Sequence, residues 1–244
     1  MNYIVVIPAR LQSTRLPEKL LIGIEGKTVL QRTYEQCLKA VPENIIYIAT
    51  DSQKIKEHAE MFTENVIMTS SNCLTGTDRI AEVANQIEAD YYINVQGDEP
   101  LINPDDIKKV INRIDLAGEA GSVYNGYAEI TDEGEYRSLS IPKAVMREDD
   151  RLLYMSRAAI PGNKAGKFRK SWKQICIYGF SRKSLSDFSN RAKKTELEEQ
   201  EDIEILRFLE MGYEVNMIKL IGNSIAVDTP EDVDRVKSIL GNDR

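Results

Sequence analysis

The N-terminal segment constrains the fold more than any other part of the chain, because it joins a buried-strand pattern to a cationic loop. Residues 4–7 are a continuous apolar run, which a strand buried on both faces requires. The run ends at Pro8. A basic loop follows, and its cations and hydroxyls are Arg10, Ser13, Thr14, Arg15 and Lys19. Ligands collect at the carboxyl ends of parallel strands, so this loop either meets a polyphosphate or forms a solvated turn.

A phosphate site in this loop would differ from the glycine-rich kinds. No glycine lies between Pro8 and Leu20, which excludes a Walker-type loop and a dinucleotide fingerprint. Phosphate would therefore be held by side-chain charge and by backbone N–H groups that turn inward. The formal charge of −7 argues against a general nucleic-acid binder. An anionic ligand would thus meet a local cationic pocket in an acidic body.

Composition is that of an ordinary globular protein. The 244 residues suffice for one large α/β domain or one domain with a sub-domain, and 29% of them are charged. The apolar runs are too short to cross a bilayer, and the first residues lack a signal-peptide pattern. Cys37, Cys73 and Cys176 have no zinc or CxxC spacing, which is typical of reduced thiols. We therefore expect a cytoplasmic protein without membrane or nucleic-acid partners.

Strands and helices alternate along the first 117 residues. Apolar runs predict further strands at residues 45–49, 65–68 and 91–95. Apolar residues at helical spacing predict helices over residues 28–41, around residues 80–87 and from residue 104 onward. Thr77 or Asp78 is the predicted cap of the second of these helices. The alternation predicts right-handed βαβ units and therefore an α/β protein with a parallel sheet.

The pattern changes after residue 117 to shorter strands of more antiparallel character. Strands are predicted at residues 122–130, 143–147, 152–156, 175–180 and 215–220. Residues 161–171 are predicted to form a loop, and residues 196–212 one charged helix that ends at Gly212. A last helix is expected after Pro230. We predict one continuous domain, in which residues 1–117 and 213–244 form an α/β core and residues 118–212 a β-rich substrate section.

Two carboxylates are candidate metal ligands. Asp98 follows the predicted strand at residues 91–95 just past Gly97, and Asp228 precedes the last helix. Magnesium prefers a few carboxylates together with phosphate oxygens and waters, so either position suits it. Asp98 or Glu99 could instead cap the next helix, a place that Asn103 suits better. Asp228 could instead complement a helix dipole, which contributes only about 0.3–1 kcal/mol. The spacing leaves both interpretations open.

Histidine chemistry is not expected. His58, the one histidine of the chain, falls in a polar helix predicted at residues 53–62, so we assign it no catalytic role. Serine and threonine nucleophiles thus lack a histidine partner, which argues against a triad hydrolase. What remains fits phosphoryl-group transfer, in which catalysis is mostly positioning and charge stabilisation.

Six motifs occur in one order along nearly the whole chain. They are IPARLQSTRLPEK (7–19), TGTDR (75–79), NVQGDEPLI (94–102), LLYMSRAAIP (152–161), IYGF (177–180) and VDTPEDVDRV (227–236). Together they resemble the 3-deoxy-manno-octulosonate cytidylyltransferase family, the CMP-KDO synthetases. The resemblance implies a Rossmann-like nucleotidyltransferase fold, a mostly parallel sheet with helices on both faces. It also implies a homodimer joined through the β-rich section, which would bind the acceptor as well.

The resemblance further implies a reaction and a set of site residues. CMP would pass from CTP to the anomeric hydroxyl of a 3-deoxy-ulosonic acid, KDO first, with magnesium (Mg²⁺) and release of pyrophosphate, for lipopolysaccharide synthesis. The residues implied to be catalytic are Arg10, Lys19, Asp98 and Asp228, the last two as metal ligands. Those implied to bind the nucleotide are Pro8, Ala9, Arg10, Ser13, Lys19, Thr75, Gly76, Arg79, Gln96 and Asp98. Those implied to bind the acceptor are Lys143, Arg157, Gln174, Tyr178 and Glu204.

The acceptor half departs from the family pattern. The family reads Arg-His-hydrophobic-Gly-hydrophobic-Tyr over residues 173–178, so Gln174 replaces a histidine that contacts the sugar. Ile205 replaces a glutamine, and residues 142–146 read Pro-Lys-Ala-Val-Met where Pro-Asn-x-Val-Lys is typical. A buried polar partner left unpaired costs about 1–3 kcal/mol. Lys143 and Gln174 could therefore serve a different acceptor, such as an amino-substituted ulosonic acid or a phosphonate.

Two other classes of function remain as alternatives. A non-catalytic nucleotide-binding regulatory module would be favoured by the loss of Arg10, Lys19, Asp98 or Asp228, but all four are present. A lectin-like role would leave the cationic first loop unexplained. The sequence therefore favours an enzyme over both.

Overall fold

The computed structural model describes residues 1–13, 15–117 and 122–242. Thr14 of the predicted basic loop and residues 118–121 of the predicted β-rich section lie outside the described residues. In the described part of the chain, no helix has the length and apolar character needed to cross a membrane.

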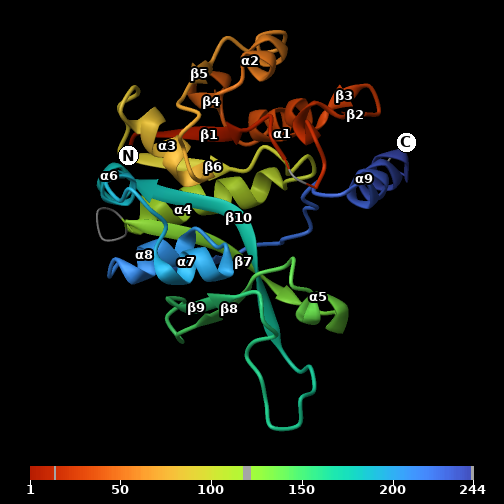
Figure 1. The fold of residues 1–244 in the computed structure, drawn as a ribbon, viewed down its shortest axis with the longest axis vertical. Helices are drawn as coiled ribbons and strands as arrows, with labels where there is room; N and C mark the ends of the chain where they lie inside the picture. The colour runs from red at the N-terminus through yellow and green to blue at the C-terminus, as the bar shows by residue number, and fades with distance from the viewer. Residues whose placement is uncertain (14, 118–121, 243–244) are drawn as a thin grey trace.

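The described strands build one nine-stranded sheet and a small two-stranded one (Figure 1). The large sheet has the order β11-β7-β10-β6-β1-β4-β5, and β8 and β9 branch from β10. Its central strands are β1 (Tyr3–Ala9), β4 (Ile46–Thr50), β5 (Val66–Met68), β6 (Tyr91–Val95), β7 (Val123–Ile130), β10 (Ser171–Ser181) and β11 (Val215–Lys219). Four pairs are parallel, while β10 runs antiparallel to β6 and β7. The predicted α/β class with a mostly parallel sheet is confirmed.

Strand β1 shows why the continuous apolar run was informative. Ile4 and Val6 pack into one core cluster, and Val5 and Ile7 pack into the other on the opposite face of the sheet. A strand buried on both faces needs apolar residues at every position rather than at alternate ones. The strand continues two residues beyond the apolar run, through Pro8 to Ala9. Pairing with β6 stops at Val6, so the strand can continue through a proline, which has no N–H to donate.

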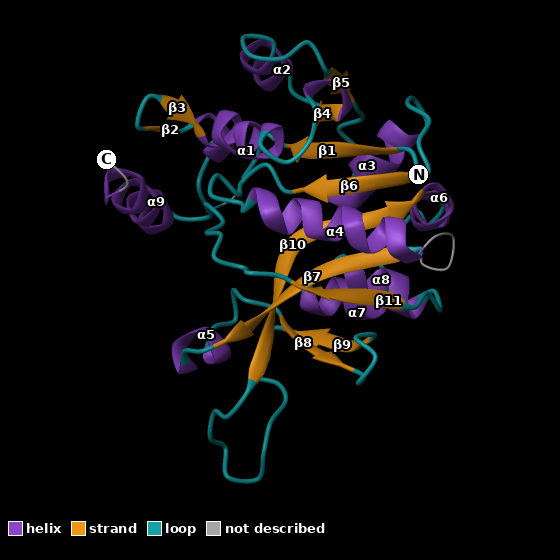
Figure 2. Ribbon diagram, turned by 180° about the vertical axis from the view of Figure 1, so that it is seen from behind, coloured by secondary structure: helices purple, strands orange, loops and turns teal. Residues whose placement is uncertain are grey.

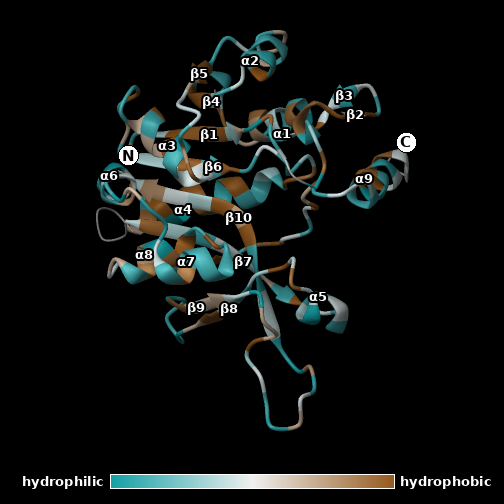
Figure 3. Cartoon of the chain, in the orientation of Figure 1, coloured by the Kyte–Doolittle hydropathy of each residue, from teal (hydrophilic) through white to brown (hydrophobic). Residues whose placement is uncertain are grey.

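Helices cover both faces of the sheet, as predicted (Figures 1 and 2). The core on one face includes residues from α1 (Val29–Leu38), α2 (Gln53–Ala59), α4 (Pro104–Ala117) and α9 (Pro230–Asn242). The core on the other face includes residues from α3 (Gly76–Ala84), α6 (Arg182–Ser189) and α8 (Ile205–Glu210), with α7 (Glu196–Glu201) beside α8. Figure 3 shows hydrophobic residues concentrated along the central strands between these two layers.

Several boundaries differ from the predicted ones. The single helix predicted over residues 196–212 is two helices, α7 and α8, because Asp202 between them has a left-handed backbone with φ of 51°. The cap of α3 is Thr75 rather than Thr77 or Asp78. Its hydroxyl accepts from the Asp78 N–H at 3.1 Å, and the Asp78 carboxylate accepts from the Thr75 N–H at 2.9 Å. The short helices α5 (Glu133–Arg137) and α6 were not predicted.

Part of the chain projects from one end of the central sheet (Figure 1). It contains α5, β8 (Lys143–Met146), β9 (Leu152–Ser156) and the loop before β10. Strand β10 joins it to the body, since its C-terminal half pairs with β6 and its N-terminal end with β8. The predicted division into a core and a β-rich section stays a prediction, and β7 and β10 of that section lie inside the central sheet.

The remaining described elements are short. They are the 3-10 helices Lys19–Leu21 and Glu43–Ile45 and the paired strands β2 (Gly23–Ile24) and β3 (Lys27–Thr28). The first of these 3-10 helices ends the basic loop and fixes the position of Lys19.

Candidate active site

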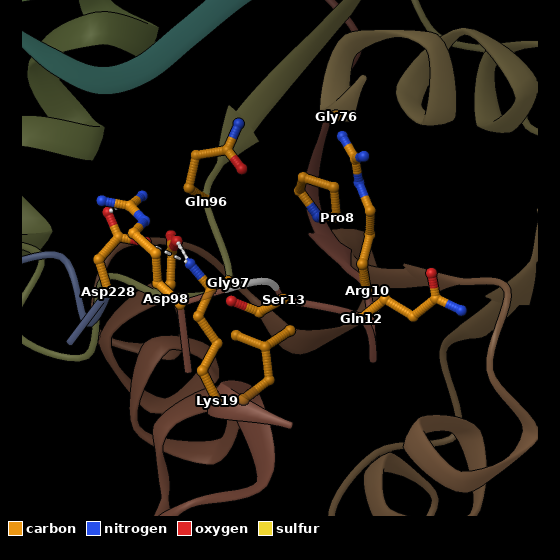
Figure 4. A pocket seen from close by; sticks show the side chains of 12 residues that line it. Pro8, Arg10, Gln12, Ser13, Lys19, Gly76, Gln96, Gly97, Asp98 and Asp228 are labelled. Atoms are coloured by element: carbon orange, nitrogen blue, oxygen red, sulfur yellow. Dashed lines mark hydrogen bonds and ion pairs between the residues drawn. The ribbon is translucent and has the colours of Figure 1, made fainter. Parts of the chain in front are cut away.

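Three segments distant in sequence meet around one cavity of about 320 Å³ (Figure 4). They are the loop after β1, the loop after β6 and the segment before α9, with the start of α3 alongside. The lining residues are Pro8, Arg10, Gln12, Ser13, Arg15, Lys19, Leu20, Gly76, Gln96, Gly97, Asp98 and Asp228. Because the first two segments follow the carboxyl ends of parallel strands, the cavity lies at the edge where such sheets bind ligands. We call it the first cavity.

Lys19 joins the two candidate metal ligands. Its ammonium group donates to the Asp98 carboxylate and, at 2.8 Å, to Oδ1 of Asp228 (Figure 4). Nη2 of Arg15 lies 2.9 Å from the other carboxylate oxygen of Asp228. Two acids that lie far apart in the sequence therefore converge on one cation.

The charges of this cluster stabilise one another. Burial lowers the pKa of the Lys19 ammonium, but Asp98 and Asp228 outweigh burial, and the pKa is raised above its usual value. Burial raises the pKa of the Asp228 carboxyl, but Lys19 and Arg15 outweigh it, and the pKa is lowered. Lys19 and Asp228 are therefore ionised at neutral pH. The wall offers cations suited to phosphate oxygens and carboxylate oxygens suited to a hard metal ion.

Neighbours of the two acids cap α4 and α9. Asp98 does not cap α4, because the side chain of Asn103 accepts from the Asp105 N–H at 2.9 Å. At α9, Thr229 and Asp232 form a reciprocal cap, in which the Thr229 hydroxyl accepts from the Asp232 N–H at 3.3 Å and the Asp232 carboxylate accepts from the Thr229 N–H at 3.0 Å. Asp98 and Asp228 are therefore left to face the cavity.

Close backbone contacts hold the loop of Asp98. A Cβ on Gly97 would lie 2.9 Å from the Pro8 carbonyl oxygen, so only glycine lets this loop pass so near β1. The Gly97 carbonyl accepts from the Thr33 hydroxyl at 3.0 Å, and the Asp98 carbonyl accepts from the Val227 N–H at 2.9 Å. The last contact ties the Asp98 loop to the segment that carries Asp228.

That segment is also anchored to α4. The buried Asp106 carboxylate accepts from the N–H groups of Ile221 at 2.8 Å and Gly222 at 3.0 Å. The Ser224 hydroxyl donates to Glu99, whose side chain is only 6% exposed. Burial, with the neighbouring Asp98 charge, raises the pKa of Glu99 to about 7. Glu99 was not among the predicted site residues and was considered only as a cap of the next helix.

A second cavity of about 890 Å³ continues from the first, and both are lined by Arg10, Gln12 and Ser13. Its other lining residues are Leu11, Pro17, Glu18, Asp51, Ser52, Ser71, Cys73 and Arg79. Arg79 is fully buried, donates to the Thr69 hydroxyl and lies 3.4 Å from Asp51, while its Nε has no hydrogen-bond partner among the described residues. Eight of the ten residues predicted to bind the nucleotide line these two connected cavities, for example Gly76 the first and Arg79 the second. Ala9 and Thr75 line neither.

A third cavity of about 380 Å³ adjoins the first on the other side, and Arg15 and Asp228 line both. It is also lined by Glu99, Glu135, Ser138, Ser140, Ile141, Pro142, Lys173, Gln174, Ile175, Cys176, Ser224, Ile225, Ala226, Thr229, Asp232 and Arg235. The Gln174 amide donates to Oδ1 of Asn125 at 3.0 Å. A molecule in this cavity would touch the same two side chains as a molecule in the first. Arg15 stood in the predicted basic loop but was given no role of its own.

Of the five residues implied to bind the acceptor, Gln174 lines the third cavity and the others do not. Lys143 is fully buried, and its ammonium donates to the carbonyl oxygens of Ser138, Ile141 and Arg157 at 2.5–2.6 Å. Because all three of its donors are used, we leave Lys143 out of the proposed acceptor site.

The other three implied residues also have partners within the chain. The Arg157 guanidinium donates to four backbone carbonyls, which belong to Leu139, Ser140, Glu201 and Asp202. Glu204 accepts from the start of α3, and the buried ring of Tyr178 stacks on Phe180. Their roles toward an acceptor stay predictions.

The donor set fits magnesium. The described residues contain no group of three or more histidine, cysteine, aspartate or glutamate side chains that could hold a metal ion. Asp98 and Asp228 would supply two carboxylates, and phosphate oxygens and waters would complete the shell, which is the mixed coordination that magnesium prefers. His58 takes no part, since its Nε2 lies 2.7 Å from the Thr28 hydroxyl at the start of α1.

A cationic loop that faces two carboxylates at the carboxyl edge of a mostly parallel sheet suits a nucleotide-dependent transferase. The family model described as cytidylyltransferase matches residues 4–221. The chain belongs to the cytidylyltransferase family. The family resemblance and the enzyme class predicted from the six motifs are confirmed.

Relatives cover nearly the whole chain. A 3-deoxy-manno-octulosonate cytidylyltransferase of Protochlamydia amoebophila is 38% identical over 242 residues, which cover 96% of this chain and 93% of the relative. An 8-amino-3,8-dideoxy-manno-octulosonate cytidylyltransferase of Shewanella loihica is 38% identical over 237 residues, with 96% of each chain covered. A solved structure of CMP:2-keto-3-deoxy-manno-octonic acid synthetase complexed with CTP is 31% identical, with a TM-score of 0.91 and 100% of both chains covered.

Proposed function

We propose that this enzyme transfers CMP from CTP to the anomeric hydroxyl of a 3-deoxy-ulosonic acid and releases pyrophosphate, with KDO as the first candidate acceptor. The observation that carries the proposal is the contact of Lys19 with both Asp98 and Asp228 in the wall of the first cavity. Both relatives described above are named for the same transfer to octulosonates. The cellular role would be lipopolysaccharide synthesis in the cytoplasm.

The nucleotide would occupy the first and second cavities. Its triphosphate would lie in the first, where Arg10, Lys19 and Ser13 offer donors to phosphate oxygens. Its nucleoside would lie in the second, where Nε of the buried Arg79 has no hydrogen-bond partner within the described part of the chain. An unpaired buried donor is costly, and a base or ribose oxygen would satisfy it. Thr75 and Gly76 would form the wall between the two ends.

Asp98 and Asp228 would hold Mg²⁺. When bound, the ion supplies positive charge to phosphate oxygens and lowers the pKa of a coordinated hydroxyl. The chain's own residues would do the rest. Arg10 and Lys19 would stabilise the negative charge that develops on the leaving pyrophosphate, and Arg15 would orient the reactants where the first and third cavities meet.

The acceptor would occupy the third cavity. Its carboxylate would find cations there in Arg15, Lys173 and Arg235, and Gln174 would offer an amide to its hydroxyls. An amino-substituted ulosonic acid is a second candidate, because Glu99 and Glu135 line the same cavity and can accept from an ammonium group. Similarity to an 8-amino-octulosonate enzyme supports this second candidate.

A homodimer through the projecting part is also proposed. Leu153 of β9 is 56% exposed, and Leu139 after α5 is 70% exposed. Among the described residues, β9 pairs with β8, and an isolated bridge joins Arg151, just before β9, to Asn216 of β11, so the rest of that second edge of β9 is unpaired. Exposed leucines beside an open strand edge are typical of a surface that another chain covers.

The acceptor panel is the experiment that tests the proposal. CTP and Mg²⁺ are incubated with KDO, 8-amino-8-deoxy-KDO, another ulosonic acid and a phosphonate, and pyrophosphate is measured. We expect pyrophosphate with one of the two octulosonates. If only another acid gives pyrophosphate, the proposed acceptor is wrong, but the proposed CMP transfer from CTP stands. Tight CTP binding without pyrophosphate from any acid would contradict the proposal and favour a regulatory module.

A further inference from the structure

We propose that Glu204 is a positioning residue for the nucleotide, which it serves by fixing the first turn of α3. This inference rests on the proposed function, since it takes the first and second cavities as the CTP site. The family resemblance assigns Glu204 to the acceptor instead, so the two roles can be separated by experiment.

Both carboxylate oxygens of Glu204 are used at the start of α3. One accepts from the Gly76 N–H at 3.1 Å, and the other accepts from the N–H and the hydroxyl of Thr77 at 2.9 and 2.5 Å. The first N–H groups of a helix have no partner within the helix. Glu204 satisfies two of them, and the Thr75 hydroxyl satisfies the next one at Asp78. An anion at this end also complements the helix dipole.

The first turn of α3, which makes these contacts with Glu204, contributes lining residues to both the first and the second cavity. Gly76 lines the first cavity and Arg79, one turn later, lines the second. A Cβ on Gly76 would lie 3.2 Å from the Gln96 side chain and 3.6 Å from Pro8, so this wall is tightly packed. A shift of the turn would therefore change the spacing between the two ends of a bound nucleotide.

A second contact, made by Arg207, joins α8 to the first turn of α3. Arg207 is fully buried, donates to Glu198 at 2.5 and 2.6 Å and to Asp78 at 3.1 Å, and lies 3.6 Å from the centre of the Phe188 ring. Asp78 belongs to the cap of α3. The start of α8 thus contacts the first turn of α3 through two side chains, Glu204 and Arg207. Because these polar groups form one buried hydrogen-bonded network, they fix the two helices relative to each other.

The test measures CTP and acceptor affinity separately in Glu204→Gln. The dissociation constant for CTP is measured by calorimetry without acceptor, and the KM for the acceptor is measured at saturating CTP. We expect CTP to bind about tenfold more weakly, a change of about 1.4 kcal/mol, with less than twofold change in the acceptor KM. Glu204→Asp keeps the charge, so it should restore part of the CTP affinity.

Glu210 provides a matched control on the same helix. Its carboxylate accepts from the N–H groups of Leu197 at 3.1 Å and Glu198 at 3.3 Å, so it holds the start of α7 as Glu204 holds the start of α3. Glu210→Gln removes the same charge without touching α3, and CTP affinity should stay unchanged. Thr77→Val removes only the hydroxyl that donates to Glu204. It should weaken CTP binding in the same direction even if Glu204→Gln does not fold.

Other outcomes would overturn the inference. A raised acceptor KM with unchanged CTP affinity in Glu204→Gln would assign Glu204 to the acceptor. An equal loss of CTP affinity in Glu210→Gln would indicate general destabilisation. If the unaltered protein binds no CTP, the proposed function fails and this inference fails with it, whereas CTP binding that ignores Glu204 and Thr77 refutes this inference alone.

Discussion

Single side chains set the charge balance of the first cavity. Asp98 and Asp228 share the Lys19 ammonium, and Arg15 reaches Asp228 from the side of the third cavity. Removal of one acid would leave a metal ion with a single protein carboxylate. It would also free Lys19 from half of its present partners.

Asp98→Asn should reduce turnover by about 10²–10⁴-fold, because the amide cannot replace a negatively charged oxygen that a metal and an ammonium group require. Pyrophosphate release under saturating CTP, Mg²⁺ and acceptor measures the effect. Asp105→Asn is the control, since Asp105 is a 73%-exposed acid nearby on α4. Activity of Asp98→Asn within a factor of three of the control would contradict the assignment.

Glu201→Gln should lower the free energy of unfolding by about 1–3 kcal/mol at neutral pH. Its carboxylate accepts from the Ser156 hydroxyl at 2.6 Å, the Arg157 N–H at 2.9 Å and the Tyr154 hydroxyl at 3.2 Å. Burial raises the pKa of Glu201, but these donors outweigh burial, and the pKa lies below its usual 4.5.

The pH dependence of that variant follows from the sign of the shift. The unfolded chain binds the proton more tightly, so the contribution of Glu201 is present above pH 4.5 and is lost as the pH falls through the lower folded pKa. We therefore measure urea unfolding of the wild-type protein and of Glu201→Gln between pH 3 and 7. The difference between their free energies of unfolding should shrink as the pH falls. The exposed Glu199→Gln is the control, and a difference independent of pH would refute the assignment.

Secondary-structure elements could be predicted where one local signal sufficed. The strands β1, β4 and β6 are short apolar runs, and α4 begins at a proline after a capping asparagine. The break at Asp202 could not be predicted, because apolar spacing continues through residues 196–212 and only the backbone shows the interruption. The sequence predicts Thr77 or Asp78 as the cap of α3, whereas the structure has Thr75, and Glu204, which accepts from the first turn of α3, lies far along the chain.

The site divides in the same way. Asp98 and the basic loop could be found because each follows the end of a buried strand. The position of Arg15 in the lining of both the first and the third cavity could not be predicted, because it depends on how the segment before α9 packs against the loop after β1. No local sequence pattern indicates that packing. The motif around Lys143 implies a contact with the acceptor. In the structure Lys143 is buried and its three N–H groups donate to backbone carbonyls, which the sequence does not indicate.

Gly222→Ala should destabilise the segment that presents Asp228. Gly222 has φ of +67°, and a Cβ there would lie 2.4 Å from the Ala128 Cβ and 2.8 Å from the Ile175 side chain. We expect a loss of about 1–3 kcal/mol in the free energy of unfolding, together with weaker binding of Mg²⁺ with CTP. Gly162→Ala, where a Cβ meets nothing within 4 Å, should change neither quantity. Equal stability of the two variants would contradict the packing described here.

The long strand β10 runs from the central sheet into the projecting part, so the proposed dimer and the proposed active site share one structural element. The proposed dimer would cover Leu153, and Leu153→Asp should therefore yield a species of half the mass in analytical ultracentrifugation. Leu116→Asp is the control, because Leu116 is 85% exposed and belongs to α4, a helix of the central body outside the projecting part (Figure 2). A wild-type chain that sediments as a monomer would contradict the proposed dimer.

One crystallographic measurement decides whether the acids and the basic loop serve the same ion. Crystals grown with CTP and Mn²⁺ in place of Mg²⁺ give an anomalous signal that locates the metal without assumptions. We predict a peak about 2.0–2.3 Å from a carboxylate oxygen of both Asp98 and Asp228, with the triphosphate in the first cavity and Lys19 turned toward it. A peak bound to neither acid, or a nucleotide seated elsewhere, would contradict the site assigned here.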